Sequence, residues 1–446
     1  MIKKKTAERE SIFEVESRLD QLLNHKHPMY ILSHEIDWTG FESRFEKLYS
    51  KDNGRPPAPI RLMVGLHYLK YTYDLSDEEV IWTWIENAYW QYFTGETYFQ
   101  KDPPIDPSSM TRFRNRLKDN GLEELLRETI ASGLRLKCIK PESLERITVD
   151  TTVQEKNIAF PTDIRLQTKM INKLVLQAKK EGGQLRQTYR KVCKIWMKKH
   201  SGYMHANQLK RASSLREKVK IRLGRIVRDI ERKITQPSSE LKSLLELADR
   251  LMKQKRKDKN KIYSLHELDI DCISKGKAHK KYEFGCKVSI VSTLKEGFLL
   301  SCEALHGNPF DGHTLRDTIT KVTLNSGTNP SLVVTDKGYR GHKCEDLAEV
   351  VVRGVTKTKC RYKKKLVKRQ SLIEAMIGHL KSESRMDRNY LKGKLGDKIN
   401  SVLCAAGQNM RKLIKYLRKK FFFLHFLLFC WLFRMFPNAS FQPRMS

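Results

Sequence analysis

Glu374 and Lys381 are the residues whose types and spacing first suggest chemistry. At about 100° per residue, a helix would place Gln370, Glu374, Gly378, Lys381 and Arg385 on one stripe. An acid flanked by cations suits a phosphodiester site, where the acid holds a metal ion and the cations hold phosphate. A solvated surface pair gives the same pattern, so the interpretation depends on further acids joining Glu374.

Two aspartates follow short apolar segments and are candidates to join it. Asp150 is expected to end the first strand, within the alternating segment 146–152, and Asp336 to end a buried strand over 332–334. Catalytic acids favour strand ends, because side chains there reach the open edge of a sheet. With Glu374 on a helix against these strands, three carboxylates would hold two Mg²⁺ or Mn²⁺ ions about 4 Å apart. One ion would activate water or a DNA 3′-hydroxyl, and the other would stabilise the leaving oxygen.

Several neighbouring residues have competing interpretations. Asp311 competes with Asp336 for the second position, but its Gly-Asn-Pro-Phe-Asp-Gly context is that of an ordinary turn. Lys337 and Arg340 flank Asp336 and are candidate phosphate contacts or plain surface residues. Three histidines do not have metal-site spacing and are interpreted as structural or phosphate-contacting: His279, His306 and His313.

Composition supports a nucleic-acid partner. The 446 residues carry a net charge of +35 with 39% hydrophobic residues, which allows two or three domains with real cores. So large a positive charge predicts a polyanionic partner, with nucleic acid first and an acidic membrane surface second. The nine cysteines form no CxxC pair, so zinc-ribbon and thioredoxin interpretations have no support. The charged N-terminus lacks the apolar core of a cleavable signal peptide, which predicts a reducing cytoplasmic compartment.

The first part of the chain is expected to be helical. A charged extension over 1–26 precedes an all-α domain over 27–140, with a capping box at Ser76 to Glu79 and many aromatic residues expected in its core. A short helix starting near Asp106 and ended by Asn120-Gly121 is a candidate for DNA contact. Three arginines would project from it, unless they form a solvated basic face: Arg112, Arg114 and Arg116.

Residues 141–416 change to an α/β pattern that predicts a mixed sheet. Strands are expected over 146–152, 285–293, 297–305, 331–336 and 350–354, and helices over 313–322, around Glu374 and over 398–416. A basic helical insertion over 165–260 interrupts this domain. It is either a solvated hairpin or an arm that grips the DNA backbone. A tail over 417–446 contains an apolar run over 421–436, which is short for a membrane span and is interpreted as a packing helix or a tail acquired by altered reading of the gene end.

With these features in place, the chain resembles the DDE transposases of bacterial insertion sequences, of the insertion sequence four/five type with a Tyr-Arg-Glu-Lys signature. The resembling segments run in family order: 148–154, 275–279, 307–314, 334–341 and 373–381. The resemblance implies an RNase H-like catalytic core preceded by a DNA-binding helical domain. It also implies that Asp150, Asp336 and Glu374 are the catalytic, metal-binding acids and that Lys381 is the signature lysine.

Two positions depart from that signature. Gln370 stands where the arginine is expected, with Arg369 beside it as a possible substitute for DNA contact. Val367 stands where the tyrosine is expected, and Tyr362 lies on a different helical face. These departures affect the handling of DNA ends and remove no metal ligand.

The predicted function is that of a metal-dependent DNA transposase. It would bind the terminal inverted repeats of its own element, cleave the ends and join the freed 3′-hydroxyls to target DNA, with both double-stranded DNAs as partners. The resemblance implies a homodimer in the DNA complex and a location in the bacterial cytoplasm at the nucleoid. Two alternatives remain: a metal-dependent nuclease without strand transfer, and a decayed, non-catalytic DNA-binding repressor.

Overall fold

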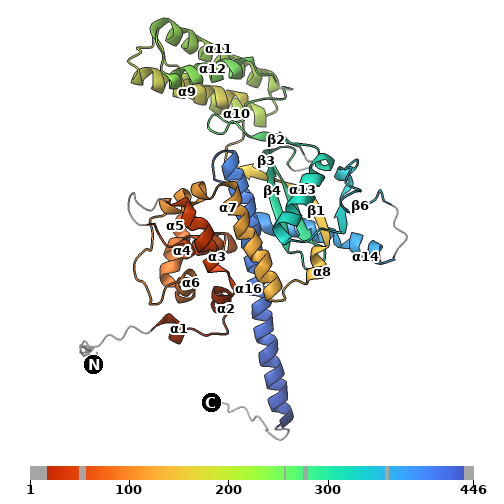
Figure 1. Cartoon of the computed structure of the whole chain (residues 1–446). Helices are drawn as coiled ribbons and strands as arrows, with labels where there is room; N and C mark the ends of the chain where they lie inside the picture. The colour runs from red at the N-terminus through yellow and green to blue at the C-terminus, as the bar shows by residue number, and fades with distance from the viewer. Residues whose placement is uncertain (1–17, 50–56, 256–257, 275–279, 357–360, 436–446) are drawn as a thin grey trace, which may run out of the picture.

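The computed structural model describes residues 18–49, 57–255, 258–274, 280–356 and 361–435. The expected motif at 275–279, which includes His279, lies outside these ranges. Figure 1 shows a helical N-terminal region beside a mixed sheet, an arm of four helices above them, and the long C-terminal helix α16 (Gly393–Met435) running along both regions.

The N-terminal region is built from helices, as expected. Their bounds are α1 Leu19–Leu22, α2 Pro28–Glu35, α3 Trp38–Phe45, η1 Glu46–Leu48, α4 Ile60–Thr72, α5 Asp77–Glu86, α6 Ala88–Thr94, α7 Ser108–Arg135 and α8 Pro141–Leu144. The predicted capping box at the start of α5 is confirmed, because the Glu79 N–H donates to Ser76 Oγ at 3.0 Å and the Ser76 N–H to Glu79 Oε2 at 2.7 Å. Most of the aromatic residues pack inside, although Trp82 is 63% exposed.

Helix α7 is longer than predicted. It starts at Ser108, after Pro107 as N-cap, and continues through Gly121 to Arg135. Gly121 lies inside the helix, where a methyl group would be 3.1 Å from the Leu117 side chain one turn earlier and in ordinary contact with Phe45 of α3 at 3.5 Å. The apolar stripe of α7 continues past the glycine through the buried Leu122 and Leu125.

Arg114 is buried, which corrects the expectation that it contacts DNA. Its guanidinium donates to both carboxylate oxygens of Asp77 at 2.8 and 2.6 Å, and Lys70 Nζ lies 2.7 Å from the same carboxylate. Burial opposes ionisation of Asp77, but the hydrogen bond from Arg114 and the charge of Lys70 lower its pKa below the usual range. Arg114 therefore joins α7 to the start of α5.

The sheet is mixed and is centred on β1 (Arg146–Lys156). The other strands are β2 Asp271–Ile273, β3 Glu283–Thr293, β4 Leu299–Leu305, β5 Leu332–Thr335, β6 Glu349–Val352 and β7 Arg388–Asn389. β3 pairs antiparallel with β1, β2 and β4, whereas β5 and β7 pair parallel with β1, and β6 parallel with β5. The predicted hairpin β3–β4 is therefore present.

Strand β1 extends beyond its predicted end. Its second half pairs with β3, from Thr151 opposite Ser289 to Glu155 opposite Gly285. Asp150 consequently lies within the strand and not at its end, which corrects the prediction. It does lie just beyond the last residue of β1 that pairs with β5, Val149.

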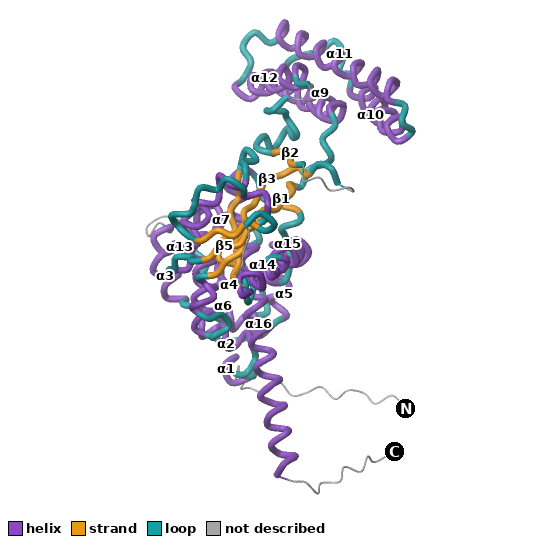
Figure 2. The backbone as a smooth tube through the Cα atoms, turned by 90° about the vertical axis from the view of Figure 1, so that its right-hand side faces the viewer, coloured by secondary structure: helices purple, strands orange, loops and turns teal. Residues whose placement is uncertain are grey.

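Helices cover both faces of the sheet (Figure 2). One face is covered by α13 (Asp311–Ser326) and the other by α14 (Arg361–Arg369), α15 (Ser371–Glu383) and α16. α16 also packs against α4 and α7, so one helix joins the N-terminal region to the sheet. It is longer at both ends than the predicted helix over 398–416.

Four helices between β1 and β2 form the arm: α9 Asp163–Lys180, α10 Arg190–His205, α11 Leu209–Lys233 and α12 Ser239–Lys253. They enclose a hydrophobic core of their own, which includes Met170, Leu174, Leu223, Ile226 and Leu251. Figures 1 and 2 both show the arm projecting from the body beyond the ends of β1 and β2.

The apolar run near the C-terminus continues α16 as far as Met435. In the part of the chain that the structure describes, we find no helix that is long and apolar enough to cross a membrane.

The burial of Arg114 predicts a large effect on stability. Arg114→Ala would leave the Asp77 carboxylate with only Lys70, and we expect the free energy of unfolding to fall by about 3 kcal/mol at pH 7. Urea titration followed by tryptophan fluorescence measures this, because Trp38, Trp84 and Trp90 are buried in the same region.

The exposed Arg112 on the same helix is the matched control, and Arg112→Ala should change stability by less than about 0.5 kcal/mol. The lowered pKa of Asp77 stabilises the fold above the pKa of an unfolded aspartate, about 4, and this contribution is lost as pH falls through the folded value. The deficit of Arg114→Ala should therefore shrink in acid. Equal stability of both variants at pH 7 would contradict the assignment.

Candidate functional site

Asp150 and Asp336 are brought side by side by the pairing of β1 with β5. The two strands are parallel, and their last paired residues are Val149 and Thr335. Asp150 and Asp336 are the next residues on each strand, and both are partly buried. Asp150 Oδ1 accepts from the N–H of Thr151 at 2.7 Å, and Asp336 Oδ1 accepts from the N–H of Gly338 at 3.0 Å.

Both aspartates point to the face covered by α14, α15 and α16. Thr151 is paired with Ser289, whose hydroxyl lies 3.3 Å from that of Thr318 on α13. Side chains alternate along a strand, so Asp150 points away from α13. Gln154, on the same side as Asp150, donates to the Asp397 carbonyl of α16 at 3.2 Å.

Asp336 follows the same alternation. Leu332 and Val334 pack with Leu366 of α14, and Asp336 is the next residue on their side. The turn after it continues as η2 (Lys337–Tyr339).

Asp311 lies close to Asp336 across Gly338. A Cβ atom at Gly338 would be 3.0 Å from Asp311 Oδ2 and 3.2 Å from Asp336 Oδ1. Asp311 already has a cation, because the buried Lys287 Nζ lies 3.0 Å from its Oδ1 and donates to the Pro309 carbonyl at 2.7 Å. This ion pair gives Asp311 a structural role in holding the start of α13 to β3.

Tyr339 is a buried residue near these acids. Burial raises its pKa well above the ordinary value, and the carboxylates of Asp311, Asp150 and Asp336 raise it further. The phenol therefore stays protonated beside three carboxylates. Sequence reasoning missed both Tyr339 and Lys287. The signal available for Lys287 was one lysine within an otherwise apolar and small-residue strand.

Glu374 is on the outer side of α15, as predicted, and is exposed, whereas Ile373, Met376 and Leu380 are buried. Helix α15 packs against β1, so Glu374 belongs to an element on the same face as the two aspartates. Among the described residues, however, no three His, Cys, Asp or Glu side chains are grouped closely enough to hold a metal ion. Asp150 and Asp336 supply oxygen donors of the kind that Mg²⁺ or Mn²⁺ binds, directly after neighbouring paired residues, and Glu374 forms no three-residue group with them in this structure.

Lys381 and Arg385 share a surface, but Arg385 lies beyond the end of α15 at Glu383, with a φ of 63°, and so is not on the helix as predicted. With Gly378, they line a groove of about 700 Å³ between α15 and the loop that precedes α5. Lys381 Nζ lies 3.8 Å from Oε1 of the buried Glu283, and Arg385 donates to the Asp74 carbonyl at 2.9 Å. Gln370 departs from this stripe because it is buried.

The two signature positions, Val367 on α14 and Gln370 at the N-cap of α15, face the protein interior. Val367 packs against the cluster formed by Leu294, Leu332, Val334, Val351 and Leu366. Gln370 is 4% exposed, and its Oε1 has no hydrogen-bond partner within the described residues. Arg369 is partly buried, and the hydroxyl of Tyr362 accepts from Arg146 at 2.6 Å. Inward packing explains how an apolar side chain is accommodated at position 367.

The other predicted DNA contacts are accessible. Arg112, Lys337 and Arg340 are exposed, and the latter two flank Asp336. Arg116 is also exposed and lies 4.8 Å over the ring of Tyr49. The predictions for these four residues stay predictions.

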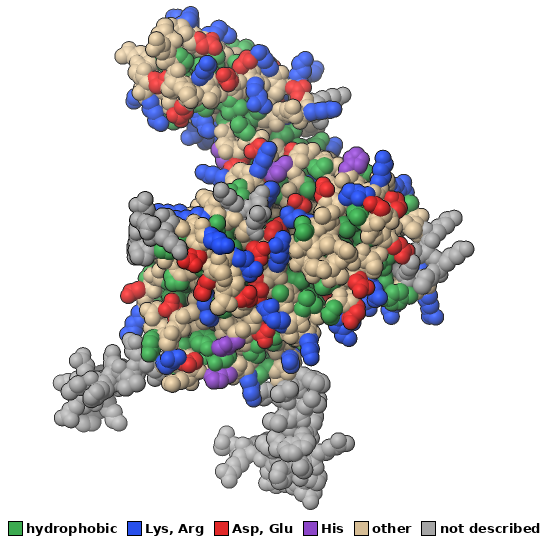
Figure 3. All heavy atoms as spheres, in the orientation of Figure 1, with side chains coloured by type: hydrophobic (Ala, Val, Ile, Leu, Met, Phe, Trp, Pro, Cys, Tyr) green, Lys and Arg blue, Asp and Glu red, His purple; other side chains and the backbone are tan. Residues whose placement is uncertain are grey.

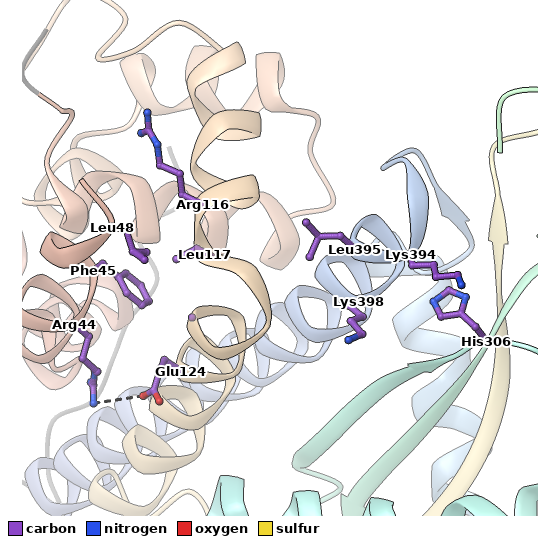
Figure 4. A pocket seen from close by; sticks show the side chains of 11 residues that line it. Arg44, Phe45, Leu48, Arg116, Leu117, Glu124, His306, Lys394, Leu395 and Lys398 are labelled. Atoms are coloured by element: carbon purple, nitrogen blue, oxygen red, sulfur yellow. Dashed lines mark ion pairs between the residues drawn. The ribbon is translucent and has the colours of Figure 1, made fainter. Parts of the chain in front are cut away.

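Arg116 lines a cleft of about 1050 Å³ between the N-terminal region and the start of α16 (Figure 4). Leu117 and Leu395 provide apolar surface, and Lys394 and Lys398 approach from α16. His306 also reaches this cleft, with Nε2 4.0 Å from the buried Asp397. Neither Asp150, Asp336 nor Glu374 lines it, so it is separate from the paired acids.

Comparison with known proteins gives matches to both main parts of the chain. Residues 17–116 match a family described as "Transposase domain (DUF772)", and residues 253–410 match the "Transposase DDE domain". A protein of Rhizobium meliloti, described as "Uncharacterized protein ORF8 in nfe locus", is 48% identical over 191 residues, which is 43% of this chain and 92% of that protein. No solved structure gave a significant match.

The pairing of Asp311 with Lys287 predicts that metal binding distinguishes the two neighbouring aspartates. Asp336→Asn should weaken Mn²⁺ binding by at least about tenfold, or about 1.4 kcal/mol, because it removes one of two adjacent oxygen donors. Asp311→Asn should change the affinity by less than about twofold, or about 0.4 kcal/mol, because Lys287 already neutralises that carboxylate.

Isothermal titration calorimetry, with electron paramagnetic resonance of the bound ion, provides the measurement. An equal loss in both variants would show that Asp311 is a ligand and would overturn this division of roles.

Proposed function

This chain belongs to the DDE transposases of insertion sequences, and from that premise we propose that it binds the terminal inverted repeats of its element, cleaves the DNA there and joins the ends to target DNA. The observation that carries the proposal is the placement of Asp150 and Asp336 as neighbours on parallel strands. Two adjacent carboxylates repel each other, and a divalent cation between them removes that repulsion.

We further propose that the mixed sheet is an RNase H-like core. The sheet arrangement supports this, because β1 carries one acid in its interior and β5, its parallel neighbour, leads directly into the other. The arm between β1 and β2 would be the helical insertion of that core, and the helices over 27–140 its DNA-binding domain. We also propose that the chain is of the insertion sequence four/five type, with the Tyr-Arg-Glu-Lys signature.

Magnesium or manganese would be held by Asp150 and Asp336, with Glu374 supplied by α15. Glu374 would have to approach the pair when DNA and metal are present, because it is exposed and apart from them in this structure. The bound metal would supply activation of a hydroxyl nucleophile and stabilisation of the leaving oxygen.

The chain's own cations would orient the DNA. Lys337 and Arg340 flank Asp336 and are exposed, so they can contact the phosphates beside the scissile bond. Lys381 lies further along the α15 groove, where it would hold the strand that leaves the site. Joining two ends to one target requires both ends in one complex, which supports a homodimer on DNA.

A DNA-binding repressor without catalysis is the second candidate. The separation of Glu374 from the two aspartates favours it. The two candidates differ in one product, because only a transposase cleaves and joins DNA. A nuclease without strand transfer would cleave and leave no joined product.

The proposal predicts metal-dependent cleavage of DNA taken from either side of the gene. With Mg²⁺, Asp336→Asn should lower the cleavage rate by about a thousandfold, or about 4 kcal/mol, while DNA binding is retained. Gel analysis of labelled ends and of joined products measures both steps.

Asp346→Asn is the control, because Asp346 is an exposed aspartate paired with Arg316 at 2.6 Å. Its cleavage rate should equal that of the wild type. Cleavage by Asp336→Asn at the wild-type rate would exclude this active site, and DNA binding without any cleavage by the wild type would support the repressor.

A further inference from the structure

The arm carries a large share of the positive charge of the chain. Residues 163–253 contain 24 lysine and arginine residues against 8 aspartate and glutamate residues. The charge is not evenly spread: α11 has ten basic and three acidic residues, whereas α12 has three of each. Figure 3 shows Lys and Arg side chains over the visible face of the arm.

Four arginines of the arm line one groove of about 570 Å³. Arg225, Arg228 and Arg232 come from α11, and Arg186 comes from the loop between α9 and α10. The spacing of three and four residues places the three arginines of α11 on one side of the helix. The buried residues of α11, such as Leu223 and Ile230, face the arm's core instead.

The loop that supplies Arg186 is fixed to α11 by polar contacts. The N–H of Arg186 donates to Asp229 Oδ2 at 2.9 Å, and Lys233 Nζ donates to the Gln184 carbonyl at 2.6 Å. The backbone hydrogen bond lowers the pKa of Asp229, so the anchor stays ionised. The Asp229 carboxylate is therefore engaged in holding the loop. With four arginines and one aspartate in its lining, the groove keeps a net positive charge.

Aromatic contacts hold the other end of this loop. The guanidinium of Arg222 lies 5.8 Å from the ring of Tyr189 and 5.2 Å from the ring of Trp196 on α10. Tyr189 has a φ of 50°, which a tyrosine adopts only when its surroundings require it. The loop is thus held at both ends, and Arg186 lines the same groove as the arginines of α11.

Arg186, Arg225 and Arg228 are exposed and have no carboxylate partner within the described residues. An open, polar groove with several guanidinium groups suits a run of phosphates, because each guanidinium can donate two hydrogen bonds to phosphate oxygens. Four of the seven residues that line the groove are arginines, and Gln187, Tyr189 and Asp229 complete the lining. Its chemistry therefore fits a nucleic-acid backbone independent of sequence.

We propose that this arginine groove is a binding site for the phosphate backbone of duplex DNA, separate from the acids of the sheet. The inference rests on the proposed function, since it assumes that DNA is the partner, and it adds a second contact on the arm. DNA held there extends beyond the catalytic region and gains affinity without added base specificity.

A double variant tests the groove in the full-length protein. Arg225→Gln with Arg228→Gln should weaken binding of a labelled 30-base-pair duplex of arbitrary sequence by about tenfold at 0.1 M salt. The slope of log K against log salt should fall by about two, one for each lost phosphate contact. Fluorescence anisotropy over a salt series measures both quantities.

Lys242→Gln with Arg250→Gln is the matched control, because it removes the same charge from exposed positions on α12 of the same arm. This variant should change the slope by much less than two. Equal slopes for the two double variants would overturn the site, as would stronger competition by single-stranded RNA than by duplex DNA. Circular dichroism of both double variants checks that they fold like the wild type.

The outcome separates this inference from the proposed function. Asp336→Asn should retain the full salt slope while it loses cleavage, and the groove variant should cleave a short end substrate at saturating protein concentration. If the wild type does not cleave DNA but the groove variant lowers the slope of log K against log salt, only the proposed function is overturned. If the wild type cleaves DNA but the groove variant leaves the slope of log K against log salt unchanged, only the inference about the groove is overturned.

Discussion

The parallel pairing of β1 with β5 determines where the two aspartates lie. Val149 is opposite Thr335, so the residues that follow are neighbours on the same face of the sheet. This register is held by apolar side chains, because Ile147, Val149 and Val333 are buried in the main core. A slip of one residue would turn that set outward and bring an aspartate into the core. Core packing and the site are therefore fixed by the same alternation.

The far end of β1 sets the position of the arm. Lys156, its last residue, is 5% exposed, with Nζ 3.0 Å from Asp397 and 3.5 Å from Glu267. Burial raises the pKa of Asp397, and Lys156 acts in the opposite direction. Lys156 belongs to β1, Glu267 to the segment that returns from the arm, and Asp397 to α16. Their buried contacts fix the exit of the arm relative to the sheet, because separating them would leave charges unpaired in the interior.

Local patterns in the sequence predicted local features well. The capping box at Ser76 depends on four adjacent residues, and the β3–β4 hairpin on an alternating pattern around one turn. The length of β1 could not be predicted, because its second half is stabilised by β3, whose paired residues are 130 or more positions later. Arg114 was misinterpreted for the same reason, since its burial depends on Asp77 on another helix. The family comparison supports the transposase assignment, and the roles of the individual acids remain proposals.

The arginines of the arm and the acids of the sheet lie in different parts of the molecule. Screening limits electrostatic effects to about 8 Å at physiological salt, and Figures 1 and 2 place α11 at the far side of the arm from the sheet. The arginines there cannot offset repulsion between Asp150 and Asp336, so groups at the sheet must do so. Lys287 does this for Asp311, and the proposed metal ion would do it for Asp150 and Asp336. Under the two proposals, the excess charge of the arm would hold DNA, and the acids at the ends of the β1–β5 pairing would cut it.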